Sequence, residues 1–146
     1  MRSEAAPCFF SSAANAAGVA YPSDECGLSY AITKDAPVEV LWTFPEQPKL
    51  SMPITLGLQN SDELNFGVSD LWSYFFPLDA VADKFEHAID SWVYGQARIA
   101  VGLGGGRKLQ VREGAKWATI YGAHGCLLPL PFKPVRFELN QFADER

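Results

Sequence analysis

Turn-forming residues divide most of the chain into short segments, and this spacing strongly limits the folds that the chain can adopt. Residues 34–37, 60–63 and 104–106 read Lys-Asp-Ala-Pro, Asn-Ser-Asp-Glu and Gly-Gly-Gly, which are sequences that favour tight turns. Parallel strands need a crossover connection of about a dozen residues or more. Links as short as these therefore predict antiparallel strands.

The segments between the turns have the two-residue period of half-buried strands. In residues 38–44, for example, Val40, Trp42 and Phe44 lie on one face of an extended chain. The predicted strands cover residues 28–33, 38–44, 54–59, 64–68, 97–103, 108–112, 117–121 and 135–139.

One stretch in the middle of the chain has the periodicity of an amphipathic helix instead. Phe85, Ile89 and Trp92 would share one face of a helix over residues 79–94, with charged residues on the opposite side. Asp79 is a suitable N-cap residue for this helix. The apolar stripe needs a partner surface, so we expect the helix to cover one face of a sheet.

The elements together predict an α+β fold. A short N-terminal helix over residues 7–17 is predicted from its alanine content and from Pro7 in its first turn. After this short helix, about seven to eight antiparallel strands are expected to form one or more sheets, with the long helix packed on a face. The whole chain, residues 1–146, is expected to form a single α+β domain, because its length is close to the commonest domain size.

Three further segments carry expectations of their own. Ser69 and Asp70 are expected to cap a short turn of helix, which leads into the aromatic run at residues 71–76. Residues 127–132 form an unusually apolar loop, which is either core or an exposed interaction patch. The tail, residues 140–146, is expected to fray.

The chain carries no sequence signal for a membrane or for an oxidising compartment. Its apolar stretches are far shorter than the roughly 20 residues that span a bilayer, and the N-terminal one is too short for a secretory signal. Cys8, Cys26 and Cys126 are widely spaced and odd in number, which favours reduced thiols. We therefore expect a cytoplasmic protein with no membrane partner.

Charge is distributed unevenly along the sequence. The formal net charge is −5, with −9 in residues 1–90 and +4 in residues 91–146. An acidic protein is a poor candidate for binding nucleic acid, so no nucleic-acid partner is expected. The acidic part favours a basic protein partner. The basic part is expected to line the solvent-facing side of a sheet, or to face the acidic half of a second copy in a homodimer.

No catalytic residue, metal site or cofactor is predicted. The glycines at 102–106 lack the lysine spacing of a phosphate-binding loop and are expected to form a hairpin turn. His87 shares its helix face with Asp83 and Asp90, a pattern that a solvated helix surface explains without the further assumption of a metal site. His124 and Cys126 lie close in sequence, but nothing marks an orienting third group.

Three hypotheses about function remain open at this point. The first is a non-catalytic protein-interaction domain of a regulatory or toxin-neutralising type. The second is a small-molecule binding domain with an aromatic pocket. The third is an enzyme that uses His87, His124 or Cys126. The candidate binding residues are the large aromatic side chains Trp42, Trp72, Tyr74, Phe76, Trp92 and Trp117.

Overall fold

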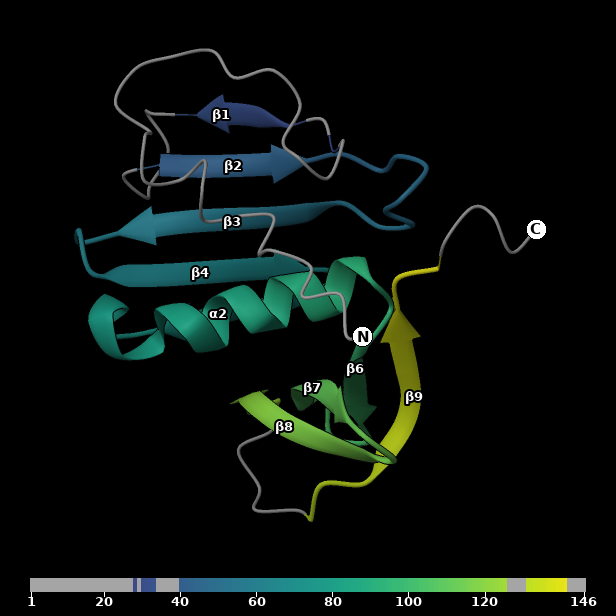
Figure 1. Ribbon diagram of the computed structural model, residues 1–146. Coiled ribbons are helices and arrows are strands. Elements are labelled where there is room, and N and C mark those ends of the chain that lie inside the picture. Colours follow the sequence, from purple (N-terminus) through teal and green to yellow (C-terminus); the bar gives the residue numbers. More distant parts are fainter. Residues whose placement is uncertain (1–27, 29, 34–39, 126–130, 142–146) are drawn as a thin grey trace, which may run out of the picture.

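The computed structural model describes residues 28, 30–33, 40–125 and 131–141 of the chain. Two antiparallel sheets and one helix make up the described part (Figure 1). The α+β class and the antiparallel pairing predicted from the short turns are thus confirmed. The predicted helix over residues 7–17 and the thiol of Cys126 lie outside the described residues, as do the whole predicted turn at 34–37 and most of the apolar loop.

The first sheet is a meander in which each strand pairs with the next along the chain. The β3–β4 turn is short, as the sequence predicts, and the β4–β5 turn is short as well, whereas residues 45–53 form a longer loop between β2 and β3. The register is continuous from Phe44 opposite Ile54 to Val68 opposite Leu71. The strands are β1 (Ala31–Thr33), β2 (Val40–Phe44), β3 (Ile54–Gln59), β4 (Glu63–Val68) and β5 (Leu71–Phe75).

Strand β5 was not predicted, and it makes nine strands where the sequence analysis expects about seven to eight. The expected helical turn at Ser69 and Asp70 is wrong, because these two residues form a tight hairpin loop between β4 and β5. Ser69 adopts a positive φ of 53°, which such a loop requires and which an ordinary helical turn does not. The aromatic residues that follow favour a strand, where their side chains alternate between the two faces.

The second sheet has the order β8-β7-β6-β9, so that its last strand returns to pair with its first. The glycines at 102–106 connect β6 and β7 in a hairpin, as predicted, and the Gly102 N–H donates to the Gly106 carbonyl at 2.7 Å. The strands are β6 (Ala97–Gly102), β7 (Arg107–Glu113), β8 (Lys116–Ala123) and β9 (Pro134–Leu139).

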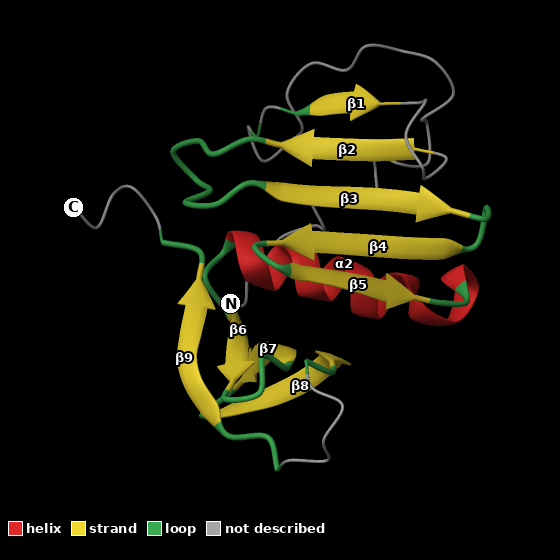
Figure 2. Cartoon of the chain, turned by 180° about the vertical axis from the view of Figure 1, so that it is seen from behind, coloured by secondary structure: helices red, strands yellow, loops and turns green. Residues whose placement is uncertain are grey.

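Helix α2 (Leu78–Val93) lies along β4 and β5 on one face of the first sheet and also contacts β6 and β7 of the second (Figures 1 and 2). It matches the predicted helix within one residue at each end. Phe85, Ile89 and Trp92 are buried, and the Trp92 ring meets Phe66 edge-on with 6.2 Å between centroids. The helix therefore joins the two sheets into one core.

The start of α2 differs from the prediction. Pro77 occupies the N-cap position, where it makes no side-chain hydrogen bond, and Asp79 sits inside the first turn. The Leu78 N–H has no acceptor within the helix and instead donates to the backbone and side-chain oxygens of Asp62, each at 2.9 Å. Asp62 lies in the β3–β4 turn, so a carboxylate distant in sequence caps the helix in place of a neighbouring residue.

The expected fraying from residue 140 is also wrong at its first residue. Asn140 is buried, and its side-chain Oδ1 accepts from the Ser51 N–H at 2.8 Å. Its Nδ2 donates to the carbonyls of Lys49 at 2.8 Å and Val93 at 3.0 Å. One amide thus holds together the end of β9, the end of α2 and the β2–β3 loop. Among the described residues, no helix is both long enough and apolar enough to cross a membrane.

Candidate functional site

The six candidate aromatic residues do not surround one pocket. Trp92 is fully buried in the core, and Trp42 packs against the same core from β2. Trp117 lies on the second sheet, where its ring stacks on Arg98. The structure brings together only the three from the aromatic run, which are Trp72, Tyr74 and Phe76.

Trp72, Tyr74 and Phe76 form what we call the aromatic strip. Alternation along β5 turns Leu71, Ser73 and Phe75 into the core and leaves the other residues outside. Tyr74 is 53% exposed and Phe76 is 64% exposed. Burial of one aromatic ring removes about 150–250 Å² from water, which favours burial of such side chains. Two neighbouring rings that stay exposed to this degree are therefore unusual.

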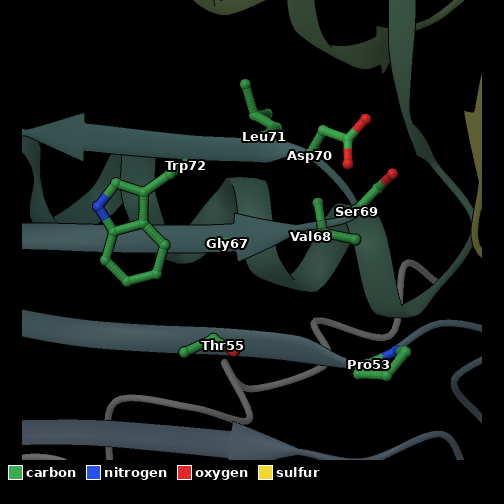
Figure 3. A pocket seen from close by; sticks show the side chains of 8 residues that line it. All are labelled: Pro53, Thr55, Gly67, Val68, Ser69, Asp70, Leu71 and Trp72. Atoms are coloured by element: carbon green, nitrogen blue, oxygen red, sulfur yellow. The ribbon is translucent and has the colours of Figure 1, made fainter. Parts of the chain in front are cut away.

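A shallow groove lies beside Trp72 on the sheet face turned away from α2 (Figure 3). The Trp72 ring extends across β4 and covers Gly67, where an added Cβ would come within 2.7 Å of the ring. Only glycine therefore allows the indole to lie flat here. The groove has a volume of about 410 Å³ and is lined by Pro53, Thr55, Gly67, Val68, Ser69, Asp70, Leu71 and Trp72.

The polar groups near the aromatic strip are already engaged in structural bonds. Asp70 pairs with Arg107 of the second sheet at 2.7 Å. Glu63 accepts from the Asn65 amide at 2.9 Å, and the Ser73 hydroxyl donates to the Phe66 carbonyl at 2.8 Å. These contacts fix the strands and the relation between the sheets.

Helix α2 carries an acidic stripe beyond the end of the strip. Asp79, Asp83, Glu86 and Asp90 follow one another at helical spacing, with the first two exposed and the last two partly buried. Burial raises the pKa of Glu86, and the carboxylates of Asp90 and Asp83 raise it further. Burial also raises the pKa of Asp90, and the nearby His87 partly offsets this. The stripe therefore holds negative charge at an energetic cost to the fold.

This cost predicts a pH-dependent effect of the Glu86→Gln substitution. Because the pKa of Glu86 is raised in the folded state, the contribution of this carboxyl to stability is fully present below its unfolded-state pKa. That contribution is lost as pH rises through the folded-state pKa. Removing the carboxyl should therefore raise the free energy of unfolding at pH 7, and the gain should disappear near about pH 3. Urea denaturation at both pH values measures the difference. Glu113→Gln, an exposed substitution on the second sheet, is the control, and a gain of equal size at both pH values would contradict the explanation.

The histidines lie apart from the aromatic strip. His87 is exposed on α2, and His124 is exposed after β8. Within the described ranges, no group of three or more His, Cys, Asp or Glu residues is arranged to hold a metal ion.

Sequence reasoning missed the surroundings of Trp117. Arg98 of β6 stacks between the rings of Trp117 and Phe137. These rings come from β8 and β9, the two outermost strands of the sheet. The available signal was the placement of Lys108, Gln110 and Arg112 at every second position, which puts polar and basic groups on one face of a strand.

Comparisons of this chain with protein-family models, with curated proteins and with solved structures found no match.

Proposed function

We propose that this chain is a non-catalytic protein-interaction domain, of a regulatory or toxin-neutralising type, that binds a basic partner where β5 runs into α2. The observation that carries the proposal is the exposure of Tyr74 and Phe76, which the exposed carboxylates of α2 follow closely in the chain. Asp79 follows Phe76 by three residues, which span about 11 Å at most. Asp83 lies one helical turn further along.

Aromatic rings and carboxylates in one patch match the chemistry of lysine and arginine side chains. A cation over an exposed Tyr or Phe ring gains about 0.5–1 kcal/mol, and more where water is excluded. Carboxylates nearby increase the rate of encounter with a positively charged partner and make it depend on salt. Exposed apolar groups supply the part of the binding energy that salt does not screen.

The bonding of the neighbouring polar groups favours a binding role over a catalytic one. Asp62 holds the start of α2, Glu63 holds Asn65, and Asp70 holds Arg107. An acid or base in catalysis must exchange its proton with a substrate. Carboxylates that already support the helix start and the joint between the sheets are better suited to keeping a binding surface rigid.

A capture experiment with the double variant Tyr74→Ser/Phe76→Ser tests this proposal. The tagged protein is incubated with lysate of its source at low salt and eluted with rising salt. We expect one stoichiometric basic protein to be released by salt from the wild type. The double variant should bind it at least about tenfold more weakly, because aromatic residues dominate binding energy at interfaces. Leu103→Ser removes a still more exposed apolar side chain from the β6–β7 hairpin turn and should leave binding unchanged.

Charge reversal separates the electrostatic part of the proposal from the apolar part. Asp79→Lys/Asp83→Lys should slow association with the captured protein and weaken its dependence on salt, with little effect on dissociation. A complex that is indifferent to salt, or that survives in the Tyr74→Ser/Phe76→Ser variant, would count against this surface.

The groove beside Trp72 supports a second candidate function, the binding of a small molecule. Its volume of about 410 Å³ falls in the range of ligand sites, and Trp72 supplies an aromatic wall. Thr55, Ser69 and Asp70 are the polar groups at its edge. An empty eluate in the capture experiment would favour this candidate, and thermal-shift screening of small molecules would then follow.

A further inference from the structure

The second sheet has a basic outer face that the proposed function does not use. Ile99, Leu109 and Val111 point into the core and are fully buried. The alternate positions point outward, and they carry Arg98 on β6 and Lys108 and Arg112 on β7. We call these three residues, together with the rings that touch them, the basic sheet face.

Arg98 is held in one orientation by three contacts. Its guanidinium carbon lies 4.1 Å from the ring centroid of Trp117 and 4.0 Å from that of Phe137. Its Nε donates to Gln110 Oε1 at 2.9 Å, and Gln110 Nε2 in turn donates to Thr119 Oγ1 at 3.1 Å. The plane and the direction of the guanidinium are therefore set before any partner arrives.

The two Nη groups of Arg98 are left without a protein acceptor among the described residues, and they are not closed off from solvent. Partial burial lowers the pKa of Arg98, because the cation has lost some of its hydration. A fixed fork of free N–H donors matches the two oxygens of a carboxylate. An incoming anion would replace the lost hydration without any need to reorganise the side chain.

Lys108 and Arg112 extend the positive surface on either side. Lys108 Nζ lies 4.2 Å from the Phe132 ring centroid, and Arg112 Nε donates to the Gly114 carbonyl at 3.2 Å. In the described part of the chain the ion pairs are Arg107–Asp70 and Arg136–Glu138, and neither involves these cations. The basic sheet face therefore has three cations that lack a carboxylate partner within the described residues.

Apolar side chains border the cations along the edge of the sheet. Val135, Phe137 and Leu139 project from β9 at every second position, and all three are exposed. The basic sheet face and this apolar border together offer both charge and apolar surface to a partner.

We infer that the basic sheet face docks an acidic segment of a partner protein, one carboxylate of which pairs with the fork of Arg98. Further carboxylates face Lys108 and Arg112, and apolar side chains of the segment cover Val135 and Phe137. Charge complementarity carries the inference, because three cations without a carboxylate partner among the described residues favour an acidic occupant.

The occupied rings favour a protein over a single-stranded nucleic acid. Platforms that stack bases keep their aromatic faces free. Here Trp117 and Phe137 each hold Arg98, and Phe132 holds Lys108. The exposed aliphatic groups Val135 and Leu139 add apolar surface that suits protein side chains. The net charge of −5 for the whole chain also opposes a long polyanion.

The test measures binding of a fluorescein-labelled peptide of alternating Glu and Val by anisotropy at low salt. We expect saturable binding by the wild type and none of a matched peptide of alternating Gln and Val. Arg98→Lys keeps the charge but removes the fork, and it should weaken binding about tenfold or more. Lys84→Gln on α2 removes one positive charge away from the basic sheet face and should leave affinity unchanged.

Further measurements keep the inference open to refutation if Arg98→Lys disturbs the sheet. Lys108→Gln/Arg112→Gln changes exposed or half-exposed groups, and it should weaken binding and reduce its dependence on salt. Equal binding of the Gln peptide, or no binding of the Glu peptide by folded wild type, would overturn the inference. Tighter binding of oligothymidylate than of the Glu peptide would overturn it in favour of nucleic acid. Self-association abolished by Arg98→Lys would overturn it in favour of a second copy of this chain.

Discussion

Replacing Trp92 with alanine should lower the free energy of unfolding by about 3–5 kcal/mol, which is a large part of the roughly 5–15 kcal/mol that stabilises a typical domain. Trp92 is fully buried near the end of α2, where its ring packs against Phe66 of β4. The helix also contacts β6 and β7. A cavity at this position would loosen the helix against both sheets.

The size of the effect depends on how the indole is satisfied. The Nε1–H of Trp92 is buried and makes no hydrogen bond with any described residue. A buried donor without a partner costs about 1–3 kcal/mol. Trp92→Phe removes this donor and keeps most of the ring, so it should destabilise the fold by less than half as much as Trp92→Ala does.

Urea unfolding followed by far-ultraviolet circular dichroism measures all three proteins without relying on tryptophan fluorescence. Trp117→Ala serves as the comparison, because that ring lies half-buried on the sheet surface and its contact with Arg98 is worth about 1 kcal/mol. If Trp92→Ala lowered the free energy of unfolding no more than Trp117→Ala does, the described packing of α2 against both sheets would be contradicted.

The helix could be predicted from the sequence and the surroundings of the candidate aromatic residues could not, for one physical reason. The stripe of Phe85, Ile89 and Trp92 is local, because the period of the helix alone decides which side chains share a face. The surroundings of a tryptophan on a strand depend on register and on which strands are neighbours. Trp42 lies opposite Leu56 on β3, whereas Trp117 meets Arg98 from another strand of the second sheet. Neither of these two contacts between strands can be predicted from the local sequence.

Strand β5 shows a second limit. Large apolar or aromatic side chains occupy both its inward and its outward positions, so hydropathy does not alternate even though burial does. Ser73 takes an inward position, and its hydroxyl is accommodated by the backbone of Phe66. Because a polar residue faces the core and an aromatic residue faces solvent, the alternation of hydropathy that identifies a strand is absent here. The same reversal exposes Tyr74 and so creates the candidate surface.

The basic sheet face depends on topology in a similar way. The sequence predicts that basic residues of the C-terminal part line the outer side of a sheet, and Arg98, Lys108 and Arg112 do so. The stack around Arg98 also needs Phe137, and β9 returns to pair with β6 although β7 and β8 lie between them in the sequence. This return connects residues far apart in the chain, which spacing alone does not predict.

Asn140→Asp should cost about 3 kcal/mol or more at neutral pH, although the two side chains have nearly the same shape. The aspartate keeps the acceptor for the Ser51 N–H. It loses the donors to the carbonyls of Lys49 and Val93, and leaves both oxygens facing a negative charge. Val93 is the last residue of α2, where the helix dipole already disfavours an anion.

The pH dependence distinguishes this mechanism from a loss of packing. A carboxyl among carbonyls has a raised pKa in the folded state, so its destabilising effect is smallest below the unfolded-state pKa of about 3.9 and grows as pH rises. Asn140→Ala lacks any ionisable group, and its cost should stay constant over the same range. Gln141→Ala, next in sequence and exposed, should change the free energy of unfolding by no more than about 0.5 kcal/mol.

Urea denaturation of the three variants at acidic and neutral pH provides the measurement. A neutral-pH cost for Asn140→Asp no larger than that for Gln141→Ala would mean that Asn140 does not anchor the end of β9. The consequence would extend to the basic sheet face, because Phe137 of β9 holds one side of Arg98. A large cost that falls at acidic pH would instead identify one buried amide as the link that keeps β9, and with it the Arg98 stack, in place.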